Sequence, residues 1–594
     1  MSSFNGSSKR LLIYTHYNAQ GLLSSYVLFT LKKMNPFYQR VIFVSNSPIR
    51  SEHREELSEV TDKIIQRENK GFDFAAWRDA IYQEGWNRIE QYDYLTLMND
   101  TCFGPIYDLA PVFKKMENKE ADFWGITEHT DFKTGFMGLG HNIKAHLQSY
   151  FMSFNQKVLQ NKAFHDFWNK VKDQKKVDHV IHKYEIGISN KLLNEGFLFE
   201  SYLPPETFKE DKNNEIAFFH PQQLIKKKAP FLKVKSLLFF PHSKYLKKIL
   251  QRCTEYDYNL IEEHITQTFT PNKALSVLDK NYVLPDASIK DEKSSLRIAM
   301  HLHAYFTDGL EKYFALLADI KSKVDLFITT DKESKRSQIQ KILDDFDLGG
   351  AGIKFILTEN RGRDILPWLK ISDQLNEYDL VGHFHVKKSS TAPEWVGKAW
   401  TDDLLKFLLE EADSIFKEFE KNKKLGIAIP DIPYYFKKTD SYLMLDEDKE
   451  HIFRLWDSLD LKKTLDEETI DKPIMSYGTM FWYRPVALKP LLNYEMFEKE
   501  FPEEPLPLKN TIAHSFEGIA VYVAWSQNYD FRVVLHHDEV FSGFDVYSKT
   551  KLNKIITNIF KTNAWRIGRF ITWIPWKIKR LVRGVTNNQI DFEN

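Results

Sequence analysis

The stretch at 92–100 ends in polar residues that could do chemistry. It reads YDYLTLMND, so the apolar positions run into Asn99 and Asp100. A carboxylate at the end of a strand is a typical oxygen ligand of a divalent cation, which can in turn bridge a diphosphate. Asn-Asp is also favourable turn chemistry. The sequence leaves both interpretations of Asp100 open, as metal ligand and as turn residue.

A second polar turn, ENKGFDFAAW at 68–77, precedes a predicted helix. Gly71 allows a tight turn or the close approach of a ligand. Asp73 would either cap the helix through its carboxylate or bind the ribose or base of a nucleotide. Lys70 would face a phosphate. His16 follows the first predicted strand, and ligands of open α/β sheets bind beyond the carboxyl ends of strands, so we expect these residues in one crevice.

Two later carboxylates, Glu185 and Glu517, are each predicted near the start of a helix. The helix dipole favours an acidic residue in a first turn whatever its function. A carboxylate at this place could also deprotonate an acceptor hydroxyl. We predict Glu185 and Glu517 as the catalytic bases.

The second half of the chain replaces the acidic step by basic residues. Lysines follow the strand at 378–386 directly, and with Arg361 they could neutralise a diphosphate without a metal. Two histidines of that strand, at i and i+2, point to one side and leave a metal site conceivable. The donor-binding residues predicted for this half are His303, Arg361, Asp364, His385 and Lys387.

An internal repeat indicates which elements position these residues. Four segments recur in the same order: 10–17 and 297–304, 41–47 and 325–331, 68–77 and 359–368, 92–100 and 378–386. Apolar strands alternate with helical stretches, which is typical of a mostly parallel sheet. We therefore predict an α/β fold of two tandem modules. The predicted boundaries are 9–240 and 296–548 for the modules, 241–295 for a helical connector and 549–594 for a tail.

The tail is strongly basic. Residues 551–583 contain nine Lys or Arg and no Asp or Glu, with apolar residues at helical spacing and three Trp. A basic amphipathic helix of this kind is typical of an anchor on an anionic membrane surface. The alternative is a terminal helix that packs on the second module.

Composition narrows the class of protein. The 594 residues carry 82 basic and 82 acidic side chains, so a general nucleic-acid binder is not expected. The two cysteines, Cys102 and Cys253, lack the spacing of a disulfide framework or a zinc site. The polar start MSSFNGSS and the absence of a run of about 20 apolar residues predict neither a signal peptide nor a spanning helix. We expect a cytoplasmic protein.

ENKGFDFAAW, YDYLTLMNDTCFGP and YEIGISNKLL, together with HFHVKKS and SYGTMFW, resemble the rhamnan synthesis protein F family over about residues 9–540. The resemblance implies two GT-A-like, Rossmann-like glycosyltransferase modules. The donor would be dTDP-β-L-rhamnose. The acceptor would be a rhamnan on a polyprenyl diphosphate lipid at the inner face of the membrane, with other polysaccharide-synthesis enzymes as further partners. Formation of α-linkages from a β donor would invert the anomeric carbon, with one general base.

The resemblance also implies residue roles. Asp100 would bind Mg²⁺ or Mn²⁺ in the first module, whereas the second module would work without a metal. Glu185 and Glu517 would be the bases, and the donor would contact His16, Lys70, Gly71, Asp73, Asn99 and Asp100 in the first module. Two alternatives stay open: a transferase for another nucleotide sugar, and a non-catalytic carbohydrate-binding or assembly protein of the same pathway.

Overall fold

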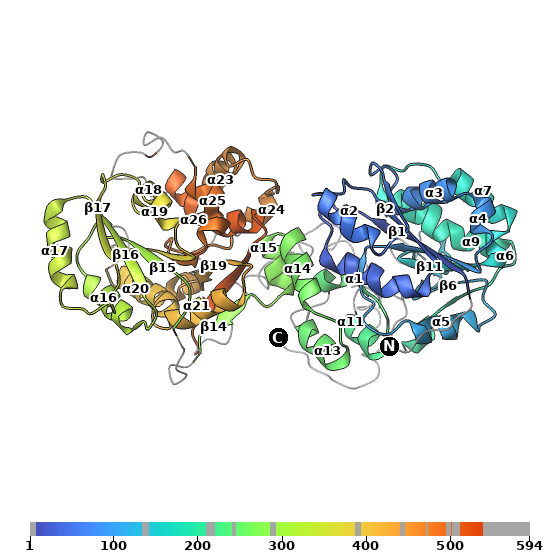
Figure 1. Cartoon of the computed structure of the whole chain (residues 1–594), viewed down its shortest axis with the longest axis horizontal. Coiled ribbons are helices and arrows are strands. Elements are labelled where there is room, and N and C mark those ends of the chain that lie inside the picture. Colours follow the sequence, from blue (N-terminus) through green and yellow to red (C-terminus); the bar gives the residue numbers. More distant parts are fainter. Residues whose placement is uncertain are drawn as a thin grey trace, which may run out of the picture. The chain divides into compact units, whose positions relative to one another are not determined.

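The computed structural model describes residues 8–133, 142–208, 220–239, 245–285, 293–386, 394–439, 446–470, 473–494, 501 and 511–537. The chain forms two compact units (Figure 1). The first comprises residues 1–279 with 460–469 and 525–529. The second comprises residues 280–459, 470–524 and 530–594.

The first unit is built on a seven-stranded, mostly parallel sheet. β1, β2, β3 and β4 are parallel, β11 is antiparallel to β4 and to β6, and β12 is parallel to β6. Every residue of β1 is buried, as expected for a parallel strand covered on both faces. The order is β12 (Phe199–Ser201), β6 (Phe123–Gly125), β11 (Phe151–Asn155), β4 (Tyr94–Asn99), β1 (Arg10–His16), β2 (Arg40–Ser45) and β3 (Lys63–Gln66).

Helices cover both faces of this sheet and make two cores (Figure 1). Leu12 and Tyr14 of β1 pack in the core that contains α1 (Ser25–Met34) and α5 (Ala110–Glu117). Ile13 packs in the other core, with Trp77 of α3 (Phe72–Glu84) and with α7 (Lys162–Lys170) and α9 (Ile186–Asn194). Side chains therefore alternate strictly between the two layers along β1.

The second unit is built on an eight-stranded sheet with the same arrangement. β15, β16, β17 and β18 are parallel, and β20 lies antiparallel between β18 and β19. The order is β14 (Asn281–Val283), β21 (Asp530–Leu535), β19 (Leu425–Pro430), β20 (Phe481–Tyr483), β18 (Leu380–His385), β15 (Ile298–His303), β16 (Val324–Thr330) and β17 (Ile353–Leu357).

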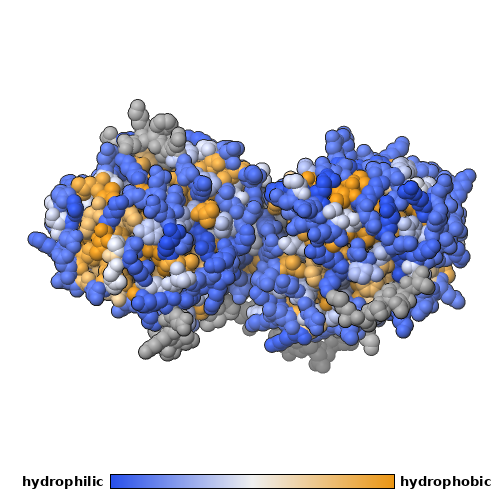
Figure 2. Space-filling model, viewed as in Figure 1, coloured by the Kyte–Doolittle hydropathy of each residue, from blue (hydrophilic) through white to orange (hydrophobic). Residues whose placement is uncertain are grey.

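Helices also cover both faces of the second sheet (Figure 1). Met300 and Leu302 of β15 pack in one core with α16 (Leu310–Asp319), α20 (Glu394–Leu408) and α21 (Ala412–Lys421). α18 (Ile365–Lys370) and α26 (Ile512–Ser526) lie on the other side. Hydrophilic residues cover most of the visible surface of each unit, with apolar residues in smaller patches (Figure 2).

The predicted α/β class with mostly parallel sheets is confirmed. Apart from the added edge strand β14, both sheets have the same strand order, with one antiparallel strand at the same place. A duplication of one module would explain this agreement and stays a prediction, as do the predicted boundaries.

The predicted connector is helical, and its helices belong to the first unit. α13 (Leu246–Cys253), α14 (Asn259–Thr268) and α15 (Pro271–Val277) contribute to the core around α1, whereas β14 joins the second sheet. The basic tail at 549–594 lies outside the described residues. Within the described part of the chain, no helix is long and apolar enough to cross a membrane.

One correspondence drawn from the repeat is wrong. The repeat aligns His16 with His303, but His16 lies on the face of Tyr14 and α1, whereas His303 alternates with Leu302 and lies on the face away from α16. A shift of one residue in a strand moves every side chain to the opposite face. The two histidines therefore have different surroundings.

Candidate functional site

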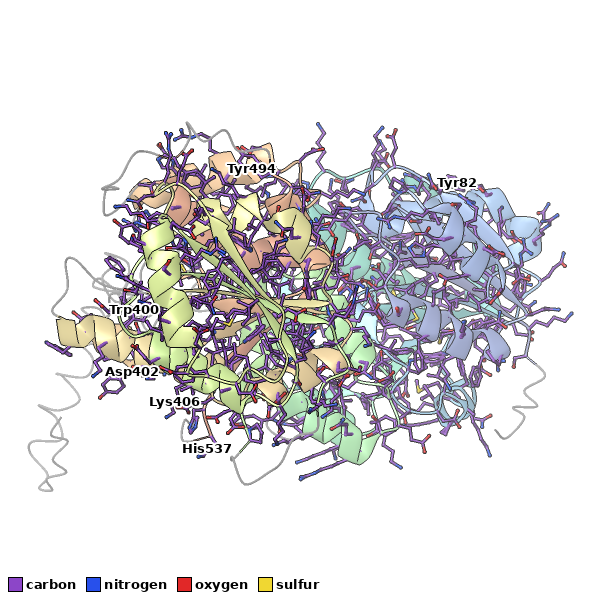
Figure 3. All side chains as sticks on the ribbon, turned by 60° about the vertical axis from the view of Figure 1, so that its left-hand side comes forward. Tyr82, Trp400, Asp402, Lys406, Tyr494 and His537 are labelled. Carbon is purple, nitrogen blue, oxygen red and sulfur yellow. The ribbon has the colours of Figure 1, made fainter. Side chains whose placement is uncertain are left out.

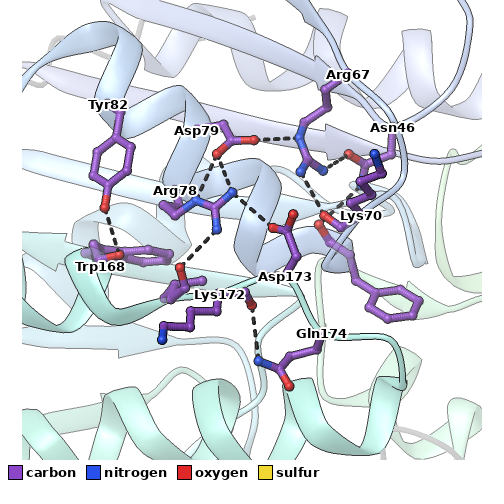
Figure 4. A network of polar contacts seen from close by, with 12 residues as sticks. Asn46, Arg67, Lys70, Arg78, Asp79, Tyr82, Trp168, Lys172, Asp173 and Gln174 are labelled. Atoms are coloured by element: carbon purple, nitrogen blue, oxygen red, sulfur yellow. Dashed lines mark hydrogen bonds and ion pairs between the residues drawn. The ribbon is translucent and has the colours of Figure 1, made fainter.

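The turn before α3 is held in shape by Arg67 (Figure 4). The guanidinium of Arg67 donates to Asn46 Oδ1 at 2.6 Å, to the Lys70 carbonyl at 2.8 Å and to Asp79 Oδ2 at 2.7 Å. Gly71 then takes a left-handed conformation, with φ +78°. A Cβ on Gly71 would lie 2.8 Å from Asp173 Cα, so the turn requires glycine both for its conformation and for space.

Lys70 does not point into the crevice. Its side chain is two-thirds exposed and pairs with Glu68. The contribution of Lys70 to this turn is its carbonyl, which binds Arg67.

Asp73 lies in the first turn of α3 and faces β4. Its Oδ2 accepts a hydrogen bond from Asn99 Nδ2 at 2.9 Å, and its Oδ1 accepts from the Phe74 N–H at 3.0 Å. The helix cap is Gly71, without a side-chain bond, so the interpretation of Asp73 as the cap is wrong. Burial raises the pKa of Asp73 to about 6, the bond from Asn99 opposes this shift, and the charge of Glu185 adds to it.

Asp100 follows β4 and lies beside the end of β1. Its Oδ2 accepts from the Tyr17 N–H at 2.9 Å and lies 4.0 Å from His16 Nε2, while the Tyr26 hydroxyl donates to its carbonyl at 2.5 Å. Burial raises the pKa of Asp100 to about 7. Burial also lowers the pKa of His16 to about 4, and the imidazole Nδ1 lies 3.3 Å from Ser45 Oγ. A neutral imidazole thus lies beside a carboxyl group whose charge is disfavoured by burial.

Glu185 directly precedes α9, near a helix start as predicted, but the helical stretch begins further back in the chain. A π-helical turn, Ile181–Glu185, connects α8 (Val177–Val180) to α9. Such turns are rare and occur frequently at functional sites. The Ser149 hydroxyl donates to Glu185 Oε2. Burial raises the pKa of Glu185, and Lys233 and Ser149 oppose this shift.

Lys233 belongs to this group. It lies in β13 (Leu232–Lys233), which pairs with β5 (Cys102–Phe103) directly after Asp100. Its ammonium lies 5.2 Å from the ring centroid of Tyr150. Burial lowers the pKa of Lys233, and the charge of Glu185 opposes that shift. Lys233 and Glu185 are both partly buried and lie within electrostatic range of one another, so each favours the charged form of the other.

The chemistry of Asp100 fits a divalent cation. Within the described residues, Oδ1 of Asp100 has no hydrogen-bond partner, and the carboxylate is 16% exposed. Burial disfavours its charge, which a bound cation would stabilise. No group of three or more His, Cys, Asp or Glu close enough to hold a metal occurs in the described parts of the chain. A cation here would therefore be held by Asp100 and, for its other ligands, by water and by phosphate oxygens of the substrate, as Mg²⁺ often is.

In the second unit, Asp364 anchors a buried hydrogen-bonded chain. Asp364 Oδ2 lies 3.1 Å from His383 Nε2, and His383 Nδ1 lies 3.0 Å from His301 Nδ1. Thr329 Oγ1 then lies 2.8 Å from His301 Nε2 and 2.9 Å from His303 Nδ1. Both ring nitrogens of His383 are thus engaged, so the conceivable metal site of His383 and His385 finds no support.

His385 and Glu517 meet at the backbone of Gly478. His385 Nε2 donates to the Gly478 carbonyl at 2.7 Å, and the Gly478 N–H donates to Glu517 Oε1 at 2.5 Å. Trp400, labelled on α20 in Figure 3, fixes the preceding residue through a 2.8 Å bond from its Nε1 to the Tyr477 carbonyl. Glu517 is the sixth residue of α26, so its predicted place at a helix start is also inexact.

Arg361 and Gly362 form the turn that corresponds to Lys70 and Gly71. Gly362 has φ +67°, and a Cβ there would lie 2.7 Å from Leu366 Cβ. Arg361 Nε donates to the Phe501 carbonyl at 2.8 Å. Lys387 lies outside the described residues.

The family profile described as rhamnan synthesis protein F matches residues 41–529, which is most of the chain. The chain belongs to the rhamnan synthesis protein F family. The predicted resemblance is confirmed.

Two relatives match only part of this chain. The uncharacterized protein WxcX of Xanthomonas campestris pv. campestris (strain B100) is 30% identical over 229 residues, which is 37% of this chain and 30% of WxcX. The uncharacterized protein y4gN of Sinorhizobium fredii is 30% identical over 215 residues, 36% of this chain and 54% of y4gN. The chain thus spans about a third to a half of these relatives.

Among solved structures, the glycosyltransferase GlyE of Streptococcus pneumoniae TIGR4 aligns at 13% identity with a TM-score of 0.23. The alignment covers 66% of this chain and 89% of GlyE. A TM-score this low does not establish a shared fold, and the family match alone decides the assignment.

The sequence did not predict four residues of the two candidate sites: Ser149, Lys233, His301 and Thr329. Lys233 stands in the apolar run APFLKVKSLLFF, where a lysine is unusual and was a usable signal. Thr329 carries no such signal, because a threonine in a buried strand is ordinary.

Proposed function

We propose that the chain is a glycosyltransferase that transfers L-rhamnose from dTDP-β-L-rhamnose to a lipid-linked rhamnan, with inversion at the anomeric carbon. The family's printed description, rhamnan synthesis, supports the product class. The observation that carries the transferase activity is the gathering of Asp73, Asn99 and Asp100 at the carboxyl end of β4. That edge of an α/β sheet is where ligands bind.

Glu185 is the proposed base of the first unit. An inverting transfer requires one group that removes the acceptor hydroxyl proton as the hydroxyl attacks the sugar. Burial raises the pKa of Glu185, which makes its carboxylate more basic than an exposed one. The charge of Lys233 opposes that shift.

Asp100 is the proposed metal ligand, for Mg²⁺ or Mn²⁺. A bound divalent cation would neutralise the diphosphate of the leaving nucleotide. The hydrogen bond between Asn99 and Asp73 fixes the end of β4, and the Tyr17 N–H holds the Asp100 carboxylate.

The test is donor turnover by the purified full chain with dTDP-rhamnose, a synthetic lipid-linked rhamnosyl acceptor and Mg²⁺ or EDTA, measured as dTDP release and product mass. Glu185→Gln should lower the kcat of the first unit by about 10²–10⁴-fold, because general-base catalysis contributes that much. Asp100→Ala should lower turnover and remove its dependence on added Mg²⁺.

The matched control is Glu128→Gln. Glu128 is also buried, burial also raises its pKa, and it also accepts a serine hydroxyl, from Ser201 at 2.6 Å. Glu128→Gln should leave kcat within about twofold, because Glu128 contacts none of the proposed reacting groups. Equal losses from Glu185→Gln and Glu128→Gln would refute the assigned base.

We also propose that the protein lies at the inner face of the membrane, where the lipid-linked acceptor is. The nine basic residues of 551–583 support this through their attraction to anionic lipid, about 1 kcal/mol each near the surface. Deletion of 551–594 should release the protein from liposomes that contain phosphatidylglycerol but not alter its weak binding to neutral liposomes. Unchanged sedimentation with anionic liposomes would contradict the proposal.

A further inference from the structure

The buried chain of the second unit runs from Asp364 to the edge of the sheet without a break. It passes through His383, His301 and Thr329 and ends at His303. His301, His383 and Thr329 are fully buried, whereas the two ends of the chain are slightly exposed, His303 at 8% and Asp364 at 7%. His303 is the last residue of β15 and so lies at its carboxyl edge. All four links measure 2.8–3.1 Å, which is hydrogen-bond distance.

The carboxylate fixes the direction of every hydrogen bond in this chain. Burial opposes ionisation of Asp364, but the neighbouring His385 and the hydrogen bond from His383 hold the pKa of Asp364 well below its usual range. Ionised Asp364 can only accept, so His383 Nε2 carries a hydrogen and its Nδ1 is an acceptor. His301 then donates from Nδ1 and accepts at Nε2 from the Thr329 hydroxyl.

His303 is the last residue of the hydrogen-bonded chain. The hydroxyl hydrogen of Thr329 is committed to His301, so Thr329 can only accept from His303 Nδ1–H. The Nε2 of His303 is therefore left with a lone pair. It has no hydrogen-bond partner among the described residues. Burial lowers the pKa of His303 to about 4, which keeps this lone pair unprotonated at neutral pH.

We infer that His303 Nε2 is the proton acceptor of the second unit, and that Thr329, His301, His383 and Asp364 are its positioning residues. The group it serves is a ligand hydroxyl at the carboxyl edge of β15, in the proposed function the attacking hydroxyl of the acceptor sugar. This role rests on that function, whereas the tautomer of His303 does not.

The proton transfer balances along the chain. The ligand O–H bond breaks as its proton moves to His303 Nε2, and the Nδ1 proton of His303 moves to Thr329 Oγ1. The Thr329 proton moves to His301 Nε2, and the His301 Nδ1 proton moves to His383 Nδ1. His383 is then doubly protonated beside ionised Asp364, so the charge ends in a buried ion pair.

This assignment replaces Glu517 as the base of the second unit. Glu517 Oε1 is occupied by the Gly478 N–H, and Gly478 also binds His385. Glu517 thus fixes the backbone at Gly478, which in turn holds His385.

The first test reads the tautomers without any turnover. In the perdeuterated full chain labelled with nitrogen-15 histidine, two-bond proton–nitrogen spectra should show His303 and His301 with the hydrogen on Nδ1 and His383 with it on Nε2. The signals are assigned by their loss in His303→Asn, His301→Asn and His383→Asn. A hydrogen on Nε2 of His303 would overturn the inference, whether or not the protein transfers sugar.

The second test breaks the chain in its middle. Thr329→Val should shift His303 away from the pure Nδ1–H form and lower the transfer rate of the second unit by about 10²-fold or more, within the range of general-base effects. Thr329→Ser should restore both. Rates are read in a Glu185→Gln background, which isolates the second unit.

Thr330→Val is the matched control, because Thr330 is equally buried on the same strand and its hydroxyl donates to the Ala304 carbonyl at 2.9 Å, outside the chain. It should preserve the His303 tautomer and the rate. Equal effects of Thr329→Val and Thr330→Val would overturn the relay. Correct tautomers with no transfer by any unit would instead refute the proposed function.

Discussion

Glu185 shows how a single residue can be tuned by the groups around it. Its environment combines burial, which raises its pKa, with a serine hydroxyl and a lysine, which lower it. Ser149 and Lys233 are separate side chains, so the effect of each on the pKa of Glu185 can be removed by its own substitution. Ser149 is the simplest to change, because its hydroxyl donates directly to Glu185.

Ser149→Ala should move the acid limb of the kcat/KM profile of the first unit to higher pH. Removal of a hydrogen bond to the ionised carboxylate raises the pKa of Glu185, so a higher pH is needed to ionise the base. The rate well above that limb should stay near the wild-type value. The profile is measured in a background of Thr329→Val, and an acid limb at the wild-type pH would contradict the role of Ser149.

At the scale of elements, two glycines that each precede a helix separate two reasons for requiring glycine. Gly71 before α3 and Gly309 before α16 share the left-handed conformation, with φ +78° and ψ 12° at Gly71 and φ +86° and ψ 6° at Gly309. A Cβ on Gly71 would meet the backbone of Asp173 at 2.8 Å, whereas a Cβ on Gly309 would meet nothing within 4 Å. Gly309→Ala therefore reports left-handed strain alone, and Gly71→Ala reports strain with crowding.

Gly309→Ala should lower the free energy of unfolding by about 1–2 kcal/mol, the cost of a left-handed alanine. Gly71→Ala should cost a further ~1–3 kcal/mol, because overpacking adds that much and Asp173 must move. Urea unfolding of both variants and of wild type measures the difference. Equal losses would show that the turn relaxes without resistance from Asp173.

The sequence predicted the elements better than the contacts between them. The helix predicted at 72–83 is α3, Phe72–Glu84, and the strand predicted at 92–100 contains β4, Tyr94–Asn99. Both follow from local periodicity. The antiparallel strand β11 was not predicted, because its direction depends on partners more than 50 residues away.

The same limit explains the missed site residues. The contact between Thr329 and His301 depends on the register of β16 against β15, and a shift of one residue would turn both side chains to the other face. His16 and His303 illustrate this directly, since similar strand sequences put them on different faces. Asp73, Asn99 and Asp100 were found because strand-end polar residues are visible in the sequence itself.

For the whole molecule, the two units should respond differently to acid. In the second unit, burial lowers the pKa of His301, His303 and His383, and partners lower that of Asp364. All these groups bind fewer protons folded than unfolded. Stability is thus fully present above the ordinary histidine pKa of about 6.5 and is lost as the pH falls below it.

The first unit contains shifts of both signs. Burial lowers the pKa of four histidines, to about 4 for His16 and His264, to about 3 for His129 and also below its ordinary value for His146. Burial also raises the pKa of Asp73 and Asp100 to about 6 and 7. A raised carboxyl pKa gives stability that increases as the pH falls from 7 toward 4. The two contributions oppose each other between pH 6.5 and 5.

The second unit should therefore lose more stability than the first between pH 6.5 and 5. Each buried neutral histidine contributes about 1.4 kcal/mol per pH unit below 6.5. Hydrogen exchange of peptides from β15 and β18 against peptides from β1 and β4, corrected for intrinsic rates, measures this. Equal or greater loss in the first unit would contradict the assigned protonation states.

β14 has a consequence for synthesis on the ribosome. This strand opens the second unit in the chain, yet it pairs with β21, and a buried ion pair joins Lys280 to Asp530 across 250 positions. At about 5–20 residues per second, β14 waits roughly 12–50 s for its partner. The nascent second unit thus carries an unpaired β14 while the residues between β14 and β21 are synthesised, and an unpaired strand can pair with other chains.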